Sequence, residues 1–71
     1  MRSRTYEIVF VGQAGATVRA EFDDCQITTS PGATTLRAEL PDQAALIGLM
    51  LRIDSLRLEV MHVFLLPPPA T

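Results

Sequence analysis

The stretch that most limits the possible folds is residues 40–56, LPDQAALIGLMLRIDSL. Its apolar residues recur at spacings of three and four, which is the pattern of a helix with one face against a core. Asp42 is a candidate N-cap, and Pro41, which lacks a backbone N–H, is tolerated in the first turn. The sequence therefore predicts one long helix that ends near Leu56. Its core-facing stripe consists of Ala45, Leu46, Leu49, Met50, Ile53 and Leu56.

The outward side of this helix is also apolar. Ile47 and Leu51 lie opposite the stripe, and the polar residues around them form only narrow strips. A small domain with a cramped core can expose two aliphatic side chains without any function. Apolar side chains gathered on a surface, however, often mark a contact with another molecule. We favour a partner chain that covers them and predict Ile47 and Leu51 as interface residues.

A chain of 71 residues is expected to form one domain, here residues 1–66, followed by a proline-rich tail at 67–71. Folding at this size buries only about 60% of the surface of the unfolded chain, so the core contributes little net stability. Cys25 is the only cysteine, and no Cys/His cluster has the spacing of a structural zinc site. With no cofactor or metal expected, self-association is the remaining source of support.

Composition and charge narrow the possible partners. Hydrophobic residues make up 48% of the chain, but no apolar run approaches the roughly 18 residues of a membrane span. The N-terminus shows no secretory signal, and with a single thiol the default location is the cytoplasm. The formal net charge is −2, and the arginines are scattered through the sequence. Nucleic-acid binding needs a concentrated basic surface, so we expect none.

The remaining periodic segments predict β-strands. In residues 5–11, one face carries Tyr6, Ile8 and Phe10, while the other is also largely apolar. Residues 25–29 and 34–40 flank the turn-forming sequence SPGA and read as a hairpin. Residues 57–66 predict a final strand that is apolar on both faces. We expect Leu58, Val60 and Phe64 on one of these faces, and Met61, Val63 and Leu65 on the other.

The apolar residues of the segment 14–24 fit both the spacing of a helix and the alternation of a strand. As a helix, Ala14, Val18 and Phe22 align at spacings of four; as a strand, Val18, Ala20 and Phe22 alternate with polar residues. We favour a short helix because the strand would need two tight hairpins in quick succession.

The resulting order is strand, short helix, strand, strand, long helix, strand. This is the split βαβ arrangement of a small α+β, ferredoxin-like two-layer sandwich, with one long and one short helix on a four-stranded antiparallel sheet. The first and third strands would be central and the last strand would lie at an edge. The alternative, with residues 17–22 as a strand, is a β-meander followed by helix and strand. Both leave apolar sheet surface uncovered and predict a homodimer, by face stacking or by pairing of the last strand, with Met61, Val63 and Leu65 at the interface.

The pieces TYEIVFVGQAG, FDDCQIT and TTLRAELPDQAALIGLMLRIDSLRLEVMHV resemble a group of small uncharacterised actinobacterial proteins whose helix typically reads DQAALHGLL. The similarity covers nearly the whole chain and is most specific at residues 42–49. Ile47 stands where that pattern commonly has a histidine. The resemblance implies an α+β fold with the same element order and implies no activity.

Few residues have the pattern of a catalytic site. His62 is the only histidine and lies in an apolar strand, where a core or interface role is commoner than catalysis. The negative charge of Asp23 and Asp24 should raise the pKa of the neighbouring Cys25 thiol and make the thiolate scarce. We interpret Cys25 as structural and the two aspartates as turn residues.

Three functions fit these observations. We favour a non-catalytic homodimeric module that assembles with its own copies or binds a protein partner. The second is a small-molecule-binding or sensory domain that holds a small apolar ligand between subunits, an analogy at the level of the fold. The third, which we favour least, is a compact enzyme acting on a small hydrophobic substrate, with His62 as acid or base and an Asp or Glu as its orienting partner. For the second function, the residues predicted to line the ligand cleft are Tyr6, Phe10, His62 and Phe64.

Overall fold

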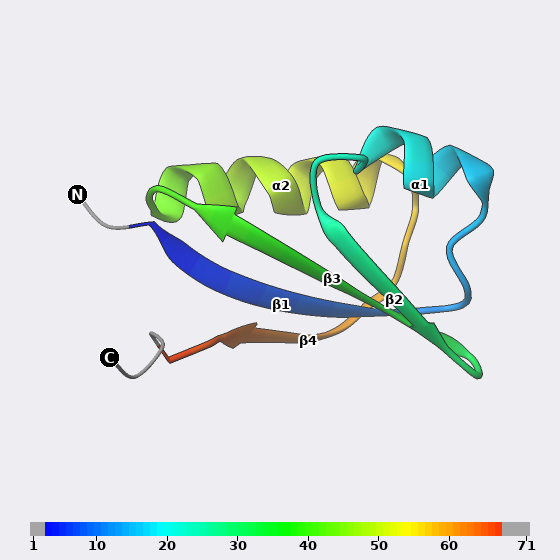
Figure 1. The fold of residues 1–71 in the computed structure, drawn as a ribbon. Helices are drawn as coiled ribbons and strands as arrows, with labels where there is room; N and C mark the ends of the chain where they lie inside the picture. The colour runs from blue at the N-terminus through cyan, green and yellow to red at the C-terminus, as the bar shows by residue number, and fades with distance from the viewer. Residues whose placement is uncertain (1–2, 68–71) are drawn as a thin grey trace.

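The computed structural model describes residues 3–67. The predicted order of elements is confirmed, and the segment with two possible periods forms the favoured short helix. Of the predicted tail, only Pro67 lies within the described residues. The elements are β1 (Arg4–Val11), α1 (Ala16–Glu21), β2 (Gln26–Ser30), β3 (Ala33–Leu40), α2 (Gln43–Ser55) and β4 (Val60–Leu65) (Figure 1).

The strands form one sheet in the order β2-β3-β1-β4, and every neighbouring pair is antiparallel. β1 and β3 are therefore central, as predicted, while β2 and β4 form the edges. Both helices lie over the same side of the sheet (Figure 1). The structure is thus an α+β fold in which a helical layer covers one face of a four-stranded antiparallel sheet.

The core lies between the helices and the two central strands. The predicted alternation of β1 is confirmed, because Ile8 and Phe10 are almost fully buried. The stripe of α2 points the same way, with Leu49 and Ile53 buried and its other members partly buried. The remaining buried apolar side chains are Phe22, Leu36 and Ala38.

Both ends of α2 have defined caps. The Asp42 carboxylate accepts a hydrogen bond from the Ala45 N–H at 2.8 Å, which confirms the N-cap and places Pro41 before the helix instead of in its first turn. No glycine ends the helix. Instead Arg57 adopts the left-handed conformation with φ of 60°, and the Leu58 N–H bonds to the Ile53 carbonyl at 3.3 Å. This is the hydrogen-bond pattern of a Schellman motif with an arginine in the usual glycine position.

A buried threonine fixes the loop between β1 and α1. The Thr34 side chain is fully buried beside Phe10, its cross-strand neighbour. Its hydroxyl donates to the Gly12 carbonyl at 2.7 Å and accepts from the Ala14 N–H at 2.9 Å. Gly12 has a φ of +92°, a conformation that residues with a Cβ rarely adopt. One side chain therefore satisfies two backbone groups where the chain leaves the sheet.

The last strand departs from its predicted alternation. It begins at Val60, and its register against β1 shifts by one residue between Val9 and Phe10. Val60 lies opposite Phe10 on the helix side, whereas Phe64 lies opposite Glu7 on the open side. The prediction that Val60 and Phe64 share a face is therefore wrong, because a β-bulge inserts one residue and changes which side chains point to each face.

Candidate interaction surface

The outer edge of β4 carries backbone groups that face away from the sheet. Leu66 donates its N–H to the Thr5 carbonyl at 2.9 Å, so the backbone of Leu66 turns toward β1. Backbone direction alternates along an antiparallel strand, so Phe64 also bonds to β1, while Val63 and Leu65 direct their N–H and C=O groups outward. Within residues 3–67, no strand pairs with this edge.

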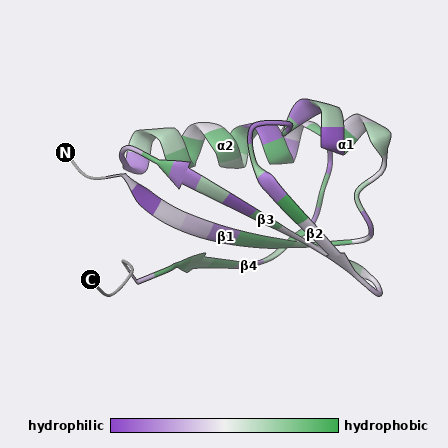
Figure 2. Ribbon diagram, viewed as in Figure 1, coloured by the Kyte–Doolittle hydropathy of each residue, from purple (hydrophilic) through white to green (hydrophobic). Residues whose placement is uncertain are grey.

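The side chains along this edge are apolar and half exposed. β4 carries no charged residue, and it is drawn predominantly green, the colour of hydrophobic residues, in Figure 2. The exposed fractions are 49% for Met61, 43% for Val63, 47% for Phe64 and 49% for Leu65. We call Met61, Val63, Phe64 and Leu65, together with the outward backbone groups, the β4 edge.

The five predicted interface residues belong to two separate surfaces. Met61, Val63 and Leu65 lie on the β4 edge. Ile47 and Leu51 are exposed by 54% and 65% on the side of α2 that is turned away from the sheet. Because the opposite side of α2 packs on the sheet, a partner strand that pairs with β4 does not lie over this outer ridge.

The four predicted cleft residues lie on both sides of the sheet. Phe10 and Tyr6 belong to the helix side, and Phe10 is 1% exposed. His62 and Phe64 lie opposite Val9 and Glu7 on the open side. Their rings stack, with centroids 5.5 Å apart and an interplanar angle of 24°. Within one chain the sheet thus separates Tyr6 and Phe10 from His62 and Phe64.

The open face of the sheet is divided between polar and apolar halves. Glu7 and Arg37 are cross-strand neighbours and form an ion pair, with Arg37 Nε 3.2 Å from the Glu7 carboxylate. The polar half continues onto β2, which reads QITTS. The rest of this face is mostly apolar, with Val11 46% exposed on β1 and the stacked rings of His62 and Phe64 on β4.

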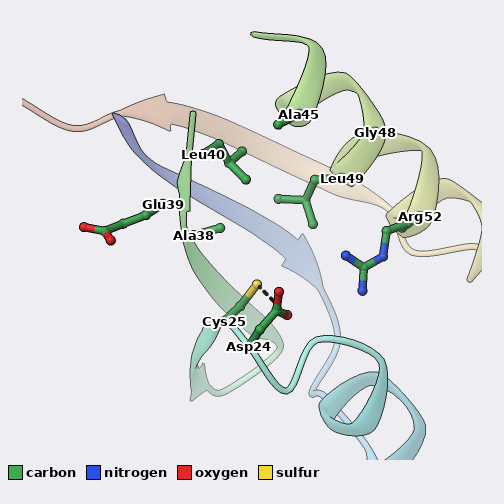
Figure 3. Close-up of a pocket in the computed structure, with 9 residues that line it drawn as sticks. All are labelled: Asp24, Cys25, Ala38, Glu39, Leu40, Ala45, Gly48, Leu49 and Arg52. Carbon is green, nitrogen blue, oxygen red and sulfur yellow. Dashed lines mark hydrogen bonds between the residues drawn. The ribbon is translucent and has the colours of Figure 1, made fainter. Parts of the chain in front are cut away.

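A pocket of about 310 Å³ opens between α2, β3 and the turn before β2 (Figure 3). Leu40 and Leu49 face each other across it, whereas the Glu39 carboxylate points away. Gly48 contributes no side chain, and a Cβ added there would meet no atom within 4 Å. This pocket could not be predicted from the sequence, because its walls come from three separated segments. The lining residues are Asp24, Cys25, Ala38, Glu39, Leu40, Ala45, Gly48, Leu49 and Arg52.

The thiol at the pocket is poorly reactive. Burial, followed by the charge of Asp24 and a hydrogen bond from the thiol to its carboxylate, raises the pKa of Cys25 to about 11. The direction of this pKa shift agrees with the prediction from the neighbouring aspartates, but burial is the larger cause. The thiolate, which is the nucleophilic form, is therefore scarce at neutral pH.

The cation at the pocket is bound by the protein itself. Arg52 donates from Nη2 to the Glu21 carbonyl at 2.5 Å, and its Nε lies 3.5 Å from the Glu21 carboxylate. Its guanidinium also lies over the Phe22 ring, 4.8 Å from the centroid. Arg52 therefore joins the end of α1 to α2.

Two other kinds of site are absent from residues 3–67. No three His, Cys, Asp or Glu side chains in this part of the chain come together in a group that could hold a metal ion. None of its helices has the length and apolarity needed to cross a membrane.

The chain matches one family among known proteins. A family model described as a domain of unknown function (DUF8691) matches residues 5–63. The chain belongs to the DUF8691 family. The match runs from β1 into β4, so the DUF8691 region includes both helices and reaches the β4 edge. No curated protein and no solved structure matches the chain. The actinobacterial relationship stays a prediction.

Proposed function

We propose that this DUF8691 protein is a non-catalytic homodimeric assembly module. The observation that carries this proposal is the β4 edge, where an uncharged strand presents outward backbone groups beside half-exposed side chains. Natural sheets commonly protect such edges with charges, prolines or a covering segment. Pairing with a second copy would bury this surface and supply the stability that a domain of this size lacks.

The opposite edge of the sheet supports this assignment by contrast. β2 is five residues long, and Gln26, Thr28, Thr29 and Ser30 on it are polar and exposed. A short polar edge gains little from burial, because its hydroxyl and amide groups must give up water. The apolar surface is therefore concentrated on β4.

The states of Cys25 and Arg52 at the pocket favour a non-catalytic role. The pKa of Cys25 is raised to about 11, which disfavours the nucleophilic thiolate. The Arg52 guanidinium is engaged by the Glu21 carbonyl and the Phe22 ring.

We further propose that the fold is of the ferredoxin-like class and that the protein acts in the cytoplasm. The strand order β2-β3-β1-β4, with one helix after β1 and one after β3, supports the fold class because each helix then connects two strands that flank a third. The single cysteine supports the location.

The test of the homodimer is the mass of the protein in solution over a wide range of concentration, by sedimentation equilibrium with circular dichroism in parallel. We expect a dimer at micromolar concentration and above. A folded monomer at every concentration would overturn the proposal.

A second candidate function is the binding of a small apolar ligand in the pocket. Its volume of about 310 Å³ lies at the lower end of the range for ligand sites, and facing leucines form its walls. Fluorescence of anilinonaphthalene sulfonate should rise on binding and fall in Gly48→Leu, whose side chain would fill the space. Gly48→Ala is the matched control. Equal fluorescence in all three proteins would reject this function.

A further inference from the structure

We propose that β4 pairs antiparallel with β4 of a second copy, with Phe64 on the twofold axis. This inference rests on the proposed homodimer and specifies its interface. It predicts a continuous sheet through both copies, with both helical layers on the same side.

The choice of edge follows from which groups face outward. The Leu66 N–H bonds to the Thr5 carbonyl, and the Val11 N–H bonds to the Glu59 carbonyl, so odd-numbered residues of β1 bond to the β4 side. Across the regular part of the ladder, Val63 and Leu65 therefore have their N–H and C=O groups available to a new strand. A partner strand is expected to bond to these residues.

The position of the axis follows from counting partners for these groups. With Phe64 opposite the partner's Phe64, Val63 lies opposite the partner's Leu65 and exchanges both backbone hydrogen bonds with it. The symmetry-related pair, Leu65 and the partner's Val63, also exchanges both backbone hydrogen bonds. Every outward group of Val63 and Leu65 is then satisfied by an equivalent group from a regular part of the strand.

The neighbouring registers leave groups poorly paired. With Val63 on the axis, Leu65 would lie opposite the partner's Met61, which sits at the register shift where the ladder is irregular. With Leu65 on the axis, Val63 would lie opposite the partner's Pro67, which has no N–H. The Phe64 register avoids both problems.

The side chains also fit this register. Directly opposed residues that do not exchange backbone hydrogen bonds lie closest, with Cα atoms about 4.5 Å apart, so the two Phe64 rings would meet on the open face. Each is already stacked on His62 at 5.5 Å, which gives a row of aromatic rings across the axis. On the helix side Val63 would contact the partner's Leu65. No Asp, Glu, Lys or Arg side chains of the two strands approach each other, because β4 contains none.

Pairing of β4 with the partner's β4 is favoured over pairing of β4 with the partner's β2. Pairing of β4 with β2 of another copy would be head-to-tail, would leave free edges at both ends and would extend into filaments. It would also place apolar side chains against the polar residues of β2. Twofold pairing of β4 closes on itself.

The first test is disulfide formation between single cysteines in a Cys25→Ala background. Phe64→Cys should cross-link under mild oxidation, because the predicted Cα separation suits a disulfide. In the same register Val63 and the partner's Val63 are diagonal neighbours about 7–8 Å apart. Val63→Cys and Leu65→Cys should therefore cross-link at least tenfold more slowly. Faster cross-linking of either control would overturn the register.

The second test removes one outward donor. Val63→Pro deletes an N–H that faces away from β1 and has no strand partner among residues 3–67, and proline is tolerated on edge strands, so the monomer fold should be kept. The dissociation constant of the dimer should rise at least tenfold. Val63→Thr keeps the N–H and the branched shape and is the matched control. Dichroism reports the fold, and if Val63→Pro unfolds, the cross-linking result decides.

Different results would reject the homodimer and the β4–β4 interface. A protein that is monomeric at every concentration rejects the homodimer and this interface with it. A dimer that is unaffected by Val63→Pro and does not cross-link through Phe64→Cys keeps the proposed function but rejects this interface. Dissociation by Ile47→Glu would then assign the contact to α2.

Discussion

Val63 lies directly opposite Ile8 on the helix side of the sheet, yet Ile8 is fully buried and Val63 is 43% exposed. These two neighbours mark the limit of the core. The helices cover β1 and leave β4 half open, although β4 is as apolar as the strand beside it. The chain therefore has more apolar sheet than its own helices can cover.

Charge on the β4 edge should separate the copies without unfolding them. Val63 and Leu65 are about half exposed, so the carboxylate of Val63→Glu or Leu65→Glu can reach water in the monomer. In a dimer paired through β4 the same charge would be buried without a partner, which is costly. We expect each variant to be monomeric with an unchanged dichroism spectrum.

The control for these variants is Thr28→Glu, a new charge on the exposed surface of the opposite edge strand. It should keep the mass of the unsubstituted protein in sedimentation. A dimer that persists in both Val63→Glu and Leu65→Glu would contradict the proposed interface.

Loss of the Thr34 hydroxyl should destabilise the protein. Thr34→Val is nearly isosteric but leaves the Gly12 carbonyl and the Ala14 N–H without the partner they have now. An unsatisfied buried group costs about 1–3 kcal/mol. We expect a loss of about 2 kcal/mol in the free energy of unfolding, measured by urea denaturation. Thr34→Ser keeps the hydroxyl and should lose clearly less; equal losses would show that the hydrogen bonds are unimportant.

Glycine at the end of α2 should stabilise the protein. Arg57 has a φ of 60°, and the left-handed conformation costs a residue with a Cβ roughly 1–2 kcal/mol. Glycine avoids this cost but loses more entropy on folding, so we expect Arg57→Gly to gain about 0.5–1 kcal/mol in thermal or urea unfolding. Arg57→Ala, which has a Cβ and no charge, separates backbone strain from the loss of the cation. A stabilisation equal to that of Arg57→Gly would assign the effect to charge.

The Cys25 thiol should make stability fall at high pH. Its pKa is about 11 in the folded protein against 9.0 for an unperturbed thiol, so the folded state keeps its proton where the unfolded state loses it. The stabilising contribution is complete below pH 9.0 and is lost as the pH rises toward about 11. Urea midpoints across this range should fall more steeply than in Cys25→Ala. Parallel curves would contradict the raised pKa.

The sequence was sufficient to predict the order of elements, because each has a clear local signal. The Asp42 cap and the apolar stripe define α2, and the turn at Pro31 and Gly32 defines the hairpin. The left-handed Arg57 could not be predicted, since an arginine there carries no recognisable stop signal. Only the hydrogen bonds at the helix end reveal it.

The candidate sites were less predictable than the fold. Alternation along β4 was misassigned because a bulge depends on pairing with β1 and leaves no mark in the strand's own sequence. The pocket depends on long-range packing that brings Cys25 and Arg52 to its rim. The apolar excess of the last strand, in contrast, is evident from composition alone.

The most direct test of the central claim is the solution mass of the unsubstituted protein and of Val63→Pro, measured side by side by sedimentation equilibrium across a wide concentration range. We expect a concentration-dependent dimer for the first, and for the second a folded protein that dimerises only at concentrations at least tenfold higher. Identical masses for the two proteins at every concentration would show that the β4 edge does not hold copies of this chain together.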